Sequence, residues 1–229
     1  MFTINNDYGY GIGFSLGYEK RYSLDEEGNV FIESGDGRVD VYIRYGNEYK
    51  APAGVFSTLT IADGKYFLES KEGEIYEFGD SYHKRATAVV DRNGNRLVMK
   101  YNDGLLSEIS DAAGHVVYLS YNNRLLVKLS ATFMDGSVTY SYDSKKRLVK
   151  CTDAMGYSTL YEYDKKNRIC GVTDAEGHRT KVQYNASGKV SLLDKDGICK
   201  NFMYYKDKTV LSEYAFAGRF LEGIVPMWS

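Results

Sequence analysis

Residues 136–177 read GSVTYSYDSKKRLVKCTDAMGYSTLYEYDKKNRICGVTDAEG and contain two copies of one pattern. In each copy a glycine is followed by two tyrosines one residue apart, an aspartate, a basic residue before an aliphatic one, and Thr-Asp. The alternation of tyrosines with polar residues has the period of two that marks a β-strand with one apolar face. Asp, Asn and Lys between the strands form turns. The stretch therefore predicts β-hairpins in tandem.

The same pattern extends beyond this stretch. An Asp-x-x-Gly motif recurs five times, and a Phe-Met-Asp-Gly variant at residues 133–136 fills the one gap in the series. With Gly73 placed before them, the successive glycines lie 21, 20, 22, 20, 21 and 20 residues apart. Such regular spacing is typical of tandem repeats, whose stacked units bury a continuous face. The five motifs are Asp91–Gly94, Asp111–Gly114, Asp153–Gly156, Asp174–Gly177 and Asp194–Gly197.

Each unit has the internal order strand, turn, strand. The fifth and seventh residues after the repeat glycine are apolar or aromatic, and the sixth is mostly polar. Further apolar residues stand five and eight positions before the next glycine, which predicts a second short strand, and turn-forming residues close the hairpin between the two. The paired positions are Met99 and Tyr101, Leu119 and Tyr121, Tyr161 and Tyr163, Val182 and Tyr184, Phe202 and Tyr204, with Tyr140 and Tyr142 one residue early.

The composition agrees with an all-β chain and excludes several functions. The 229 residues include 22 Tyr and 23 Gly but only 2 Pro, a balance that suits strands and tight turns rather than helices. A formal net charge of -2 argues against a protein that binds nucleic acid by neutralising phosphates. Three cysteines without a paired Cys or His motif predict neither a disulfide framework nor a zinc site.

We expect a single repeat domain over residues 1–229. Residues 1–72 are predicted to be a degenerate start of the same architecture, 73–214 the tandem repeats, and 215–229 an atypical C-terminal segment with the only Trp, Trp228. No basic and apolar leader opens the sequence, and no apolar run is long enough to span a membrane. As written, the sequence predicts a soluble protein that starts in the cytoplasm.

These repeats resemble those of the YD-repeat, or Rhs-repeat, family. Its unit reads roughly G-x-x-x-x-Y-x-Y-D-x-x-G-R-L-x-x-x-T-D-x-x, and the best matches are residues 136–153 and 156–174. The resemblance covers nearly the whole chain, is most specific over residues 73–205, and extends to a glycine-rich start, Gly11–Tyr18. Lys146 and Asn167 stand where the family has a turn glycine, which leaves the type of those two turns open.

The resemblance implies an antiparallel β-ribbon that coils into a hollow shell, which in large bacterial Rhs and toxin-complex proteins encloses a C-terminal toxin. Such shells have many more repeats than this chain, and the family context implies export or secretion. The Asp-Pro-x-Gly core that is linked to self-cleavage in this family is absent, because neither Pro52 nor Pro226 follows an aspartate. We therefore expect the opening part of a shell, or a short relative of one, and not a toxin.

The polar motifs do not point to catalysis. Each Asp-x-x-Gly turn offers one or two carboxylates, whereas calcium takes about six to eight converging oxygens, so we expect these aspartates to accept hydrogen bonds from turn amides. The sequence brings no nucleophile or acid partner close to His83, His115 or His178. We therefore predict no enzyme activity, no catalytic residue, no cofactor and no metal.

The tyrosines are the remaining candidates for binding. Those at the fifth and seventh positions are expected to pack one face of the sheet. Tyr118 and Tyr157 lie out of that register, so we expect them on the other side, where rings can stack on sugars. The predicted function is a non-catalytic segment of an Rhs-type shell or scaffold that encapsulates or displays a toxin or effector; the alternative is a carbohydrate-binding surface module. The expected partners are the remainder of a larger shell, its toxin cargo or a glycan, and neither nucleic acid nor a membrane.

Overall fold

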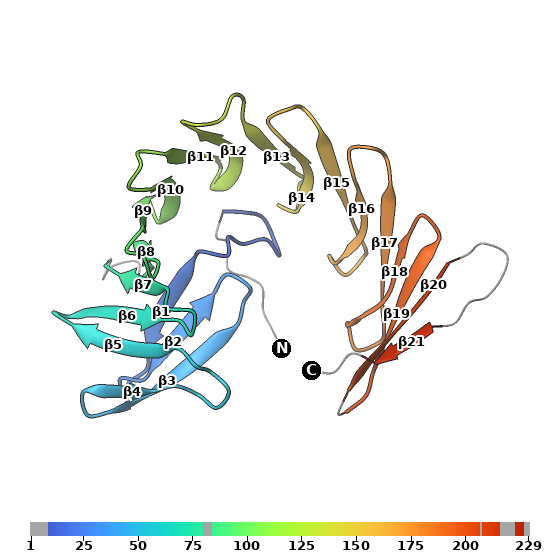
Figure 1. Ribbon diagram of the computed structural model, residues 1–229. Coiled ribbons are helices and arrows are strands. Elements are labelled where there is room, and N and C mark those ends of the chain that lie inside the picture. Colours follow the sequence, from blue (N-terminus) through green and yellow to red (C-terminus); the bar gives the residue numbers. More distant parts are fainter. Residues whose placement is uncertain (1–8, 80–83, 207, 216–222, 227–229) are drawn as a thin grey trace. The chain divides into compact units, whose positions relative to one another are not determined.

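The computed structural model describes residues 9–79, 84–206, 208–215 and 223–226 (Figure 1). All regular elements in these ranges are β-strands, and the described ladders are antiparallel, as expected for tandem hairpins. The chain divides into two compact units, residues 1–139 with 144–147 and residues 140–143 with 148–229. The predicted all-β, antiparallel fold is confirmed.

The first four strands form a sheet of their own within the first unit. They pair in chain order, and the ladder between β2 and β3 aligns Val30 with Tyr42. The strand Val39–Tyr45 therefore belongs to this separate sheet, although residues 1–72 were predicted as a degenerate start of the repeat architecture. The strands are β1 (Lys20–Leu24), β2 (Val30–Ser34), β3 (Val39–Tyr45) and β4 (Glu48–Lys50).

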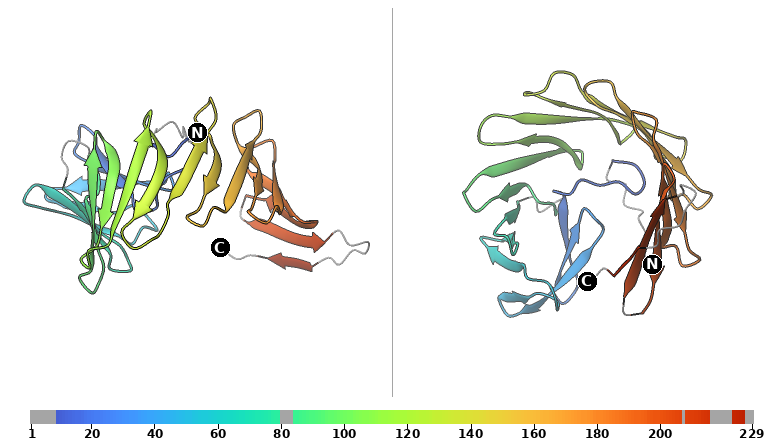
Figure 2. Two further views of the ribbon diagram at one scale, coloured as in Figure 1. Left: turned by 90° about the horizontal axis from the view of Figure 1, so that it is seen from above. Right: turned by 45° about the vertical axis from the view of Figure 1, so that its right-hand side comes forward.

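The repeats form the long sheet, in which each strand pairs with its neighbour in the chain (Figure 2). In the first unit it comprises β5 (Thr58–Ala62), β6 (Lys65–Glu69), β7 (Ile75–Phe78), β8 (Ala88–Val90), β9 (Arg96–Asn102), β10 (Leu105–Ser110), β11 (Val116–Asn122) and β12 (Leu125–Ala131), and β13 (Val138–Tyr142) contains the boundary. In the second unit it comprises β14 (Leu148–Thr152), β15 (Ser158–Tyr163), β16 (Ile169–Thr173), β17 (Arg179–Tyr184), β18 (Val190–Lys195), β19 (Ile198–Tyr204), β20 (Thr209–Ala215) and β21 (Gly223–Pro226).

The core of the first unit lies between these two sheets. Tyr22 of β1 places its ring 4.7 Å from that of Tyr66 and 5.5 Å from that of Phe78, measured between ring centres. Such aromatic pairs add stabilisation beyond the area that they bury. Alternate residues of a strand are buried in both sheets, as the period of two predicts. The buried side chains include Val30, Ile32, Tyr42, Tyr66, Leu68, Tyr76, Phe78, Met99 and Leu119.

The segment before β1 lies against the same face of the long sheet. Gly9 accepts a hydrogen bond from the backbone N–H of Leu126. A Cβ atom at Gly9 would lie 2.8 Å from a ring carbon of Tyr121, and its backbone φ is +86°, so this position requires glycine. The glycine-rich start of the chain therefore allows its backbone to pass close to the tyrosine-bearing face.

A buried ion pair fixes the segment further along. Glu19 Oε1 accepts a hydrogen bond from Arg85 Nη1 at 3.0 Å, and the two residues are 5% and 8% exposed. Burial raises the pKa of Glu19, while the guanidinium groups of Arg85 and Arg21 act in the opposite direction. Breaking such a pair leaves one buried charge uncompensated, which is strongly destabilising. The ion pair therefore favours the one position of the segment before β1 in which Glu19 meets Arg85.

The turns fall into two classes. The two-residue hairpins of the long sheet have two successive positive φ angles, as at Asp103-Gly104 (47° and 71°), and match the type I′ pattern. Wider turns begin with Asp, Asn or Ser and have one positive φ three residues later, as at Gly177 (88°), whose turn is closed by Asp174. Asp194–Gly197 differs from the other Asp-x-x-Gly motifs, because it ends in the two-residue hairpin Asp196-Gly197, whose residues both have positive φ (52° and 82°). Asp194 Oδ1 still accepts a hydrogen bond from the backbone N–H of Gly197, as predicted for a turn aspartate.

The two turns that lack the family glycine keep the wider conformation. Lys146 has φ 62° and Asn167 has φ 60°, in the left-handed region that Gly188 occupies at 81°. The turn class is therefore maintained without glycine, at a conformational cost that is larger for Lys than for Asn.

We expect Lys146→Gly to raise the free energy of unfolding by about 1 kcal/mol, because it relieves the left-handed strain. Asn167→Gly should give a smaller gain, since Asn tolerates this region. Chemical denaturation measures both. Lys165→Gly is the control, because Lys165 is a turn residue without positive φ, and it should not be stabilised. Equal gains at all three positions would contradict the strain argument.

Candidate functional site

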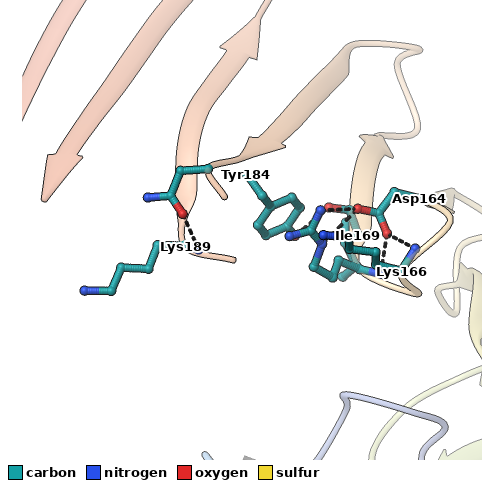
Figure 3. A network of polar contacts seen from close by, with 7 residues as sticks. Asp164, Lys166, Ile169, Tyr184 and Lys189 are labelled. Carbon is teal, nitrogen blue, oxygen red and sulfur yellow. Dashed lines mark hydrogen bonds and ion pairs between the residues drawn. The ribbon is translucent and has the colours of Figure 1, made fainter. Parts of the chain in front are cut away.

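The best-defined polar arrangement of the second unit starts at the turn after β15. Asp164 Oδ1 accepts hydrogen bonds from the backbone N–H groups of Lys166 (2.8 Å) and Arg168 (3.0 Å), as Figure 3 shows. Its Oδ2 accepts two more from the guanidinium of Arg168, at 2.8 and 2.7 Å. The backbone and side-chain hydrogen bonds from Arg168 hold the pKa of Asp164 below its usual range. One carboxylate thus closes the turn and orients the arginine.

Arg168 and Ile169 then hold the tyrosine of the next repeat. The guanidinium carbon of Arg168 lies 4.0 Å from the ring centre of Tyr184, a cation–π contact. The hydroxyl of Tyr184 donates to the backbone carbonyl of Ile169 at 2.7 Å (Figure 3). We call Asp164, Arg168, Ile169 and Tyr184 the tyrosine clamp. It joins the turn and second strand of one repeat to the first strand of the following repeat.

A β-bulge accompanies the acceptor carbonyl. In the β15–β16 ladder Glu162 is opposite Gly171 and Tyr163 is opposite Ile169, so Cys170 is the extra residue. A bulge disrupts the ladder locally, and a backbone carbonyl without a partner costs free energy if it is buried. The hydroxyl of Tyr184 supplies a donor at this position.

The same hydrogen bond recurs along the chain with constant spacing. Each donor tyrosine is at the seventh position of its repeat, and each acceptor lies 15 residues earlier. Leu106 also stands beside a register shift, between Leu106 and Glu108. The further pairs are Tyr101 with Ala86 (2.9 Å), Tyr121 with Leu106 (2.8 Å) and Tyr163 with Leu148 (2.7 Å).

Burial raises the pKa of two of these phenols further above neutral pH. It raises the pKa of Tyr184, and it raises the pKa of Tyr121 to about 12. Both hydroxyls are therefore donors at neutral pH, which their contacts with carbonyl oxygens require. The prediction that the seventh-position tyrosines pack the sheet was correct but incomplete, because it did not include the role of the hydroxyl.

The two tyrosines predicted to bind ligands are exposed. Tyr118, on β11, is 45% exposed, and Tyr157, in the turn before β15, is 57% exposed. Both contrast with the half-buried seventh-position tyrosines, such as Tyr184. Tyr118 belongs to the first compact unit and Tyr157 to the second. Their role in binding stays a prediction.

The histidines and aspartates of the repeat turns contact one another within their own turns. His115 Nδ1 lies 2.8 Å from Asp111 Oδ2, and His178 Nδ1 lies 3.5 Å from Asp174 Oδ2. Asp91 Oδ1 accepts hydrogen bonds from the amides of Asn93 and Asn95, as predicted for a turn-closing aspartate. His83 and Trp228 lie outside the described residues.

Two absences within the described ranges bear on other functions. No group of three or more His, Cys, Asp or Glu residues could hold a metal ion there. No helix within those ranges is long and apolar enough to cross a membrane.

Part of the chain matches a known repeat family. The family model described as RHS Repeat matches residues 142–179, which contain most of the tyrosine clamp, from Asp164 to Ile169. The resemblance to Rhs repeats is thereby confirmed for this segment. No curated protein matches the sequence.

Several solved structures match this chain at low sequence identity. The crystal structure of TcdB2-TccC3-Cdc42 has 12% sequence identity and a TM-score of 0.46, with 85% of this chain and 12% of that chain covered. TcdB2-TccC3 without its hypervariable C-terminal region has 12% identity and a TM-score of 0.45, covering 88% and 13%. A porin-like protein from Bacteroides uniformis has 11% identity and a TM-score of 0.37, covering 79% and 96%. This chain thus spans about an eighth of the first two proteins.

We expect Tyr184→Phe to lower the free energy of unfolding by about 1 kcal/mol, because it removes the hydroxyl donor but retains the ring. Urea denaturation of the full chain measures the effect. Tyr157→Phe, at an exposed tyrosine, should change stability by less than about 0.5 kcal/mol. If the two variants have the same stability, the hydrogen bond to Ile169 does not stabilise the repeat junction.

Proposed function

We propose that the chain is a non-catalytic structural segment of an Rhs-type shell or scaffold. The observation that carries the proposal is the contact between successive repeats: a tyrosine hydroxyl donates to a carbonyl of the preceding repeat at four junctions, and the tyrosine clamp adds a cation–π contact at Tyr184. Contacts of this kind depend only on neighbouring repeats, so an array can be extended by adding units. The RHS Repeat match over residues 142–179 supports the same structural role.

Burial in the two units supports a role in enclosing another chain. In the first unit β1 and the segment before it pack against the face of the long sheet that carries the fifth and seventh positions, and Met99 and Leu119 at the fifth position are buried. In the second unit Tyr161 and Val182 at corresponding positions are only half-buried. We propose that this face contacts the remainder of a shell or a toxin cargo. Export, which the family context implies, is part of the same proposal.

We expect the mass of the protein, measured by size-exclusion chromatography with light scattering, to grow with concentration. Within the first unit β5 pairs on one side only, with β6, and an unpaired strand edge seeks partners. Ile61→Lys on β5 should reduce this association, because lysine blunts strand edges. Leu160→Lys, at a similarly exposed position on the two-sided strand β15, is the control and should not. A monomer at every concentration would contradict the segment proposal and favour a self-contained module.

The second candidate function is a carbohydrate-binding surface. The exposure of Tyr118 and Tyr157 favours it, because exposed rings can stack on sugar faces. We expect saturable binding in a glycan screen to fall on Tyr118→Ala or Tyr157→Ala, with the circular dichroism spectrum unchanged. Wild-type protein that binds no glycan in the screen would rule out this candidate.

A further inference from the structure

A cavity lies in the first unit beside three consecutive turns of the long sheet. Its volume is about 360 Å³, within the range of small-molecule sites. Val89 and Leu97 contribute apolar surface to its lining, and Tyr18, from the segment before β1, contributes an aromatic ring. The lining also contains three carboxylates, one from each turn: Glu74, Asp91 and Asp111.

The charge of this lining is negative. Its one cationic residue, Arg96, donates two hydrogen bonds to the carboxylate of Glu77 and is thereby neutralised. The hydrogen bonds from the side chains of Asn95 and His115 lower the pKa of Asp91 and Asp111, so both carboxylates are ionised at neutral pH. An anion would therefore be repelled, whereas a cation would be attracted.

The aromatic ring is a separate indication of the ligand. Tyr18 is 52% exposed although it lines the cavity, so much of this residue is accessible to a ligand. An organic cation over such a ring gains a cation–π interaction. A bare metal ion fits less well, because no suitable ligand group of three His, Cys, Asp or Glu residues occurs in the described part of the chain.

We propose that this cavity binds the guanidinium group of an arginine side chain presented by a partner chain. Arginine has an apolar stem that suits Val89 and Leu97, and a planar cationic head that stacks on rings and pairs with carboxylates. The stem lies on the apolar lining, the head faces Asp91 and Asp111, and the ring of Tyr18 covers it. This site is independent of the proposed shell role, because the partner that presents the arginine need not be part of a shell.

The first experiment is an NMR titration of the full chain with Nα-acetyl-arginine amide. Its citrulline analogue is the matched neutral probe, because it differs in replacing the cationic guanidinium by a urea. We expect saturable binding of the arginine probe and at least about tenfold weaker binding of the citrulline probe. Equal binding of the two, or no binding of the arginine probe at about 10 mM, would overturn the proposal. N-acetylglucosamine is a third probe, and if it alone binds, the cavity is a sugar site instead.

Variants locate the binding in the cavity. Tyr18→Ala removes the ring, and Asp111→Asn removes a charge while leaving an oxygen for the amides of Ala113 and His115. Each should weaken arginine binding at least about tenfold. Asp174→Asn changes the corresponding turn of the second unit, outside the cavity, and should leave binding unchanged. An equal loss in Asp174→Asn, or full binding in Tyr18→Ala, would show that the arginine probe binds elsewhere.

Discussion

The hydrogen bond from a tyrosine hydroxyl to a backbone carbonyl 15 residues earlier is the interaction on which the repeat array depends. A bulge beside the acceptor disrupts the regular ladder, and the ring that brings the hydroxyl also buries the sheet face. Phenylalanine would cover the face but leave the carbonyl of Ile169 without this donor. The abundance of tyrosine therefore has a chemical reason beyond strand propensity.

The order of residues in the repeat follows from the same contact. Asp164 closes its turn with backbone amides and orients Arg168, which lies over the ring of Tyr184. The residue after the arginine, Ile169, presents the acceptor carbonyl. Tyrosine, aspartate, arginine and the aliphatic residue thus act as one unit, and single interactions within such a unit are not additive.

The two compact units differ in how they bury their sheets. The first has a second layer, β1–β4, and a buried ion pair between Glu19 and Arg85. In the second unit Leu148, Gly171 and Cys199 are the buried residues among those described, so most of its sheet face is half-buried. Stability is not uniform in such a molecule, and regions with fewer buried apolar contacts open more readily.

The sequence by itself determined the strands, the hairpins and the face of the seventh-position tyrosines, because a period of two and a repeat of about twenty residues are properties of the chain order. It also predicted that aspartates such as Asp91 accept hydrogen bonds from turn amides. It left the turns at Lys146 and Asn167 open, since a single residue type does not specify a backbone angle, and it did not distinguish the two-residue hairpin at Asp196-Gly197 from the wider turns. Only the tertiary structure decided that β1–β4 form a separate layer, that Glu19 meets Arg85, and that Tyr18 joins Asp91 and Asp111 around one cavity. These contacts join residues far apart in the chain, and no local pattern encodes which of them meet.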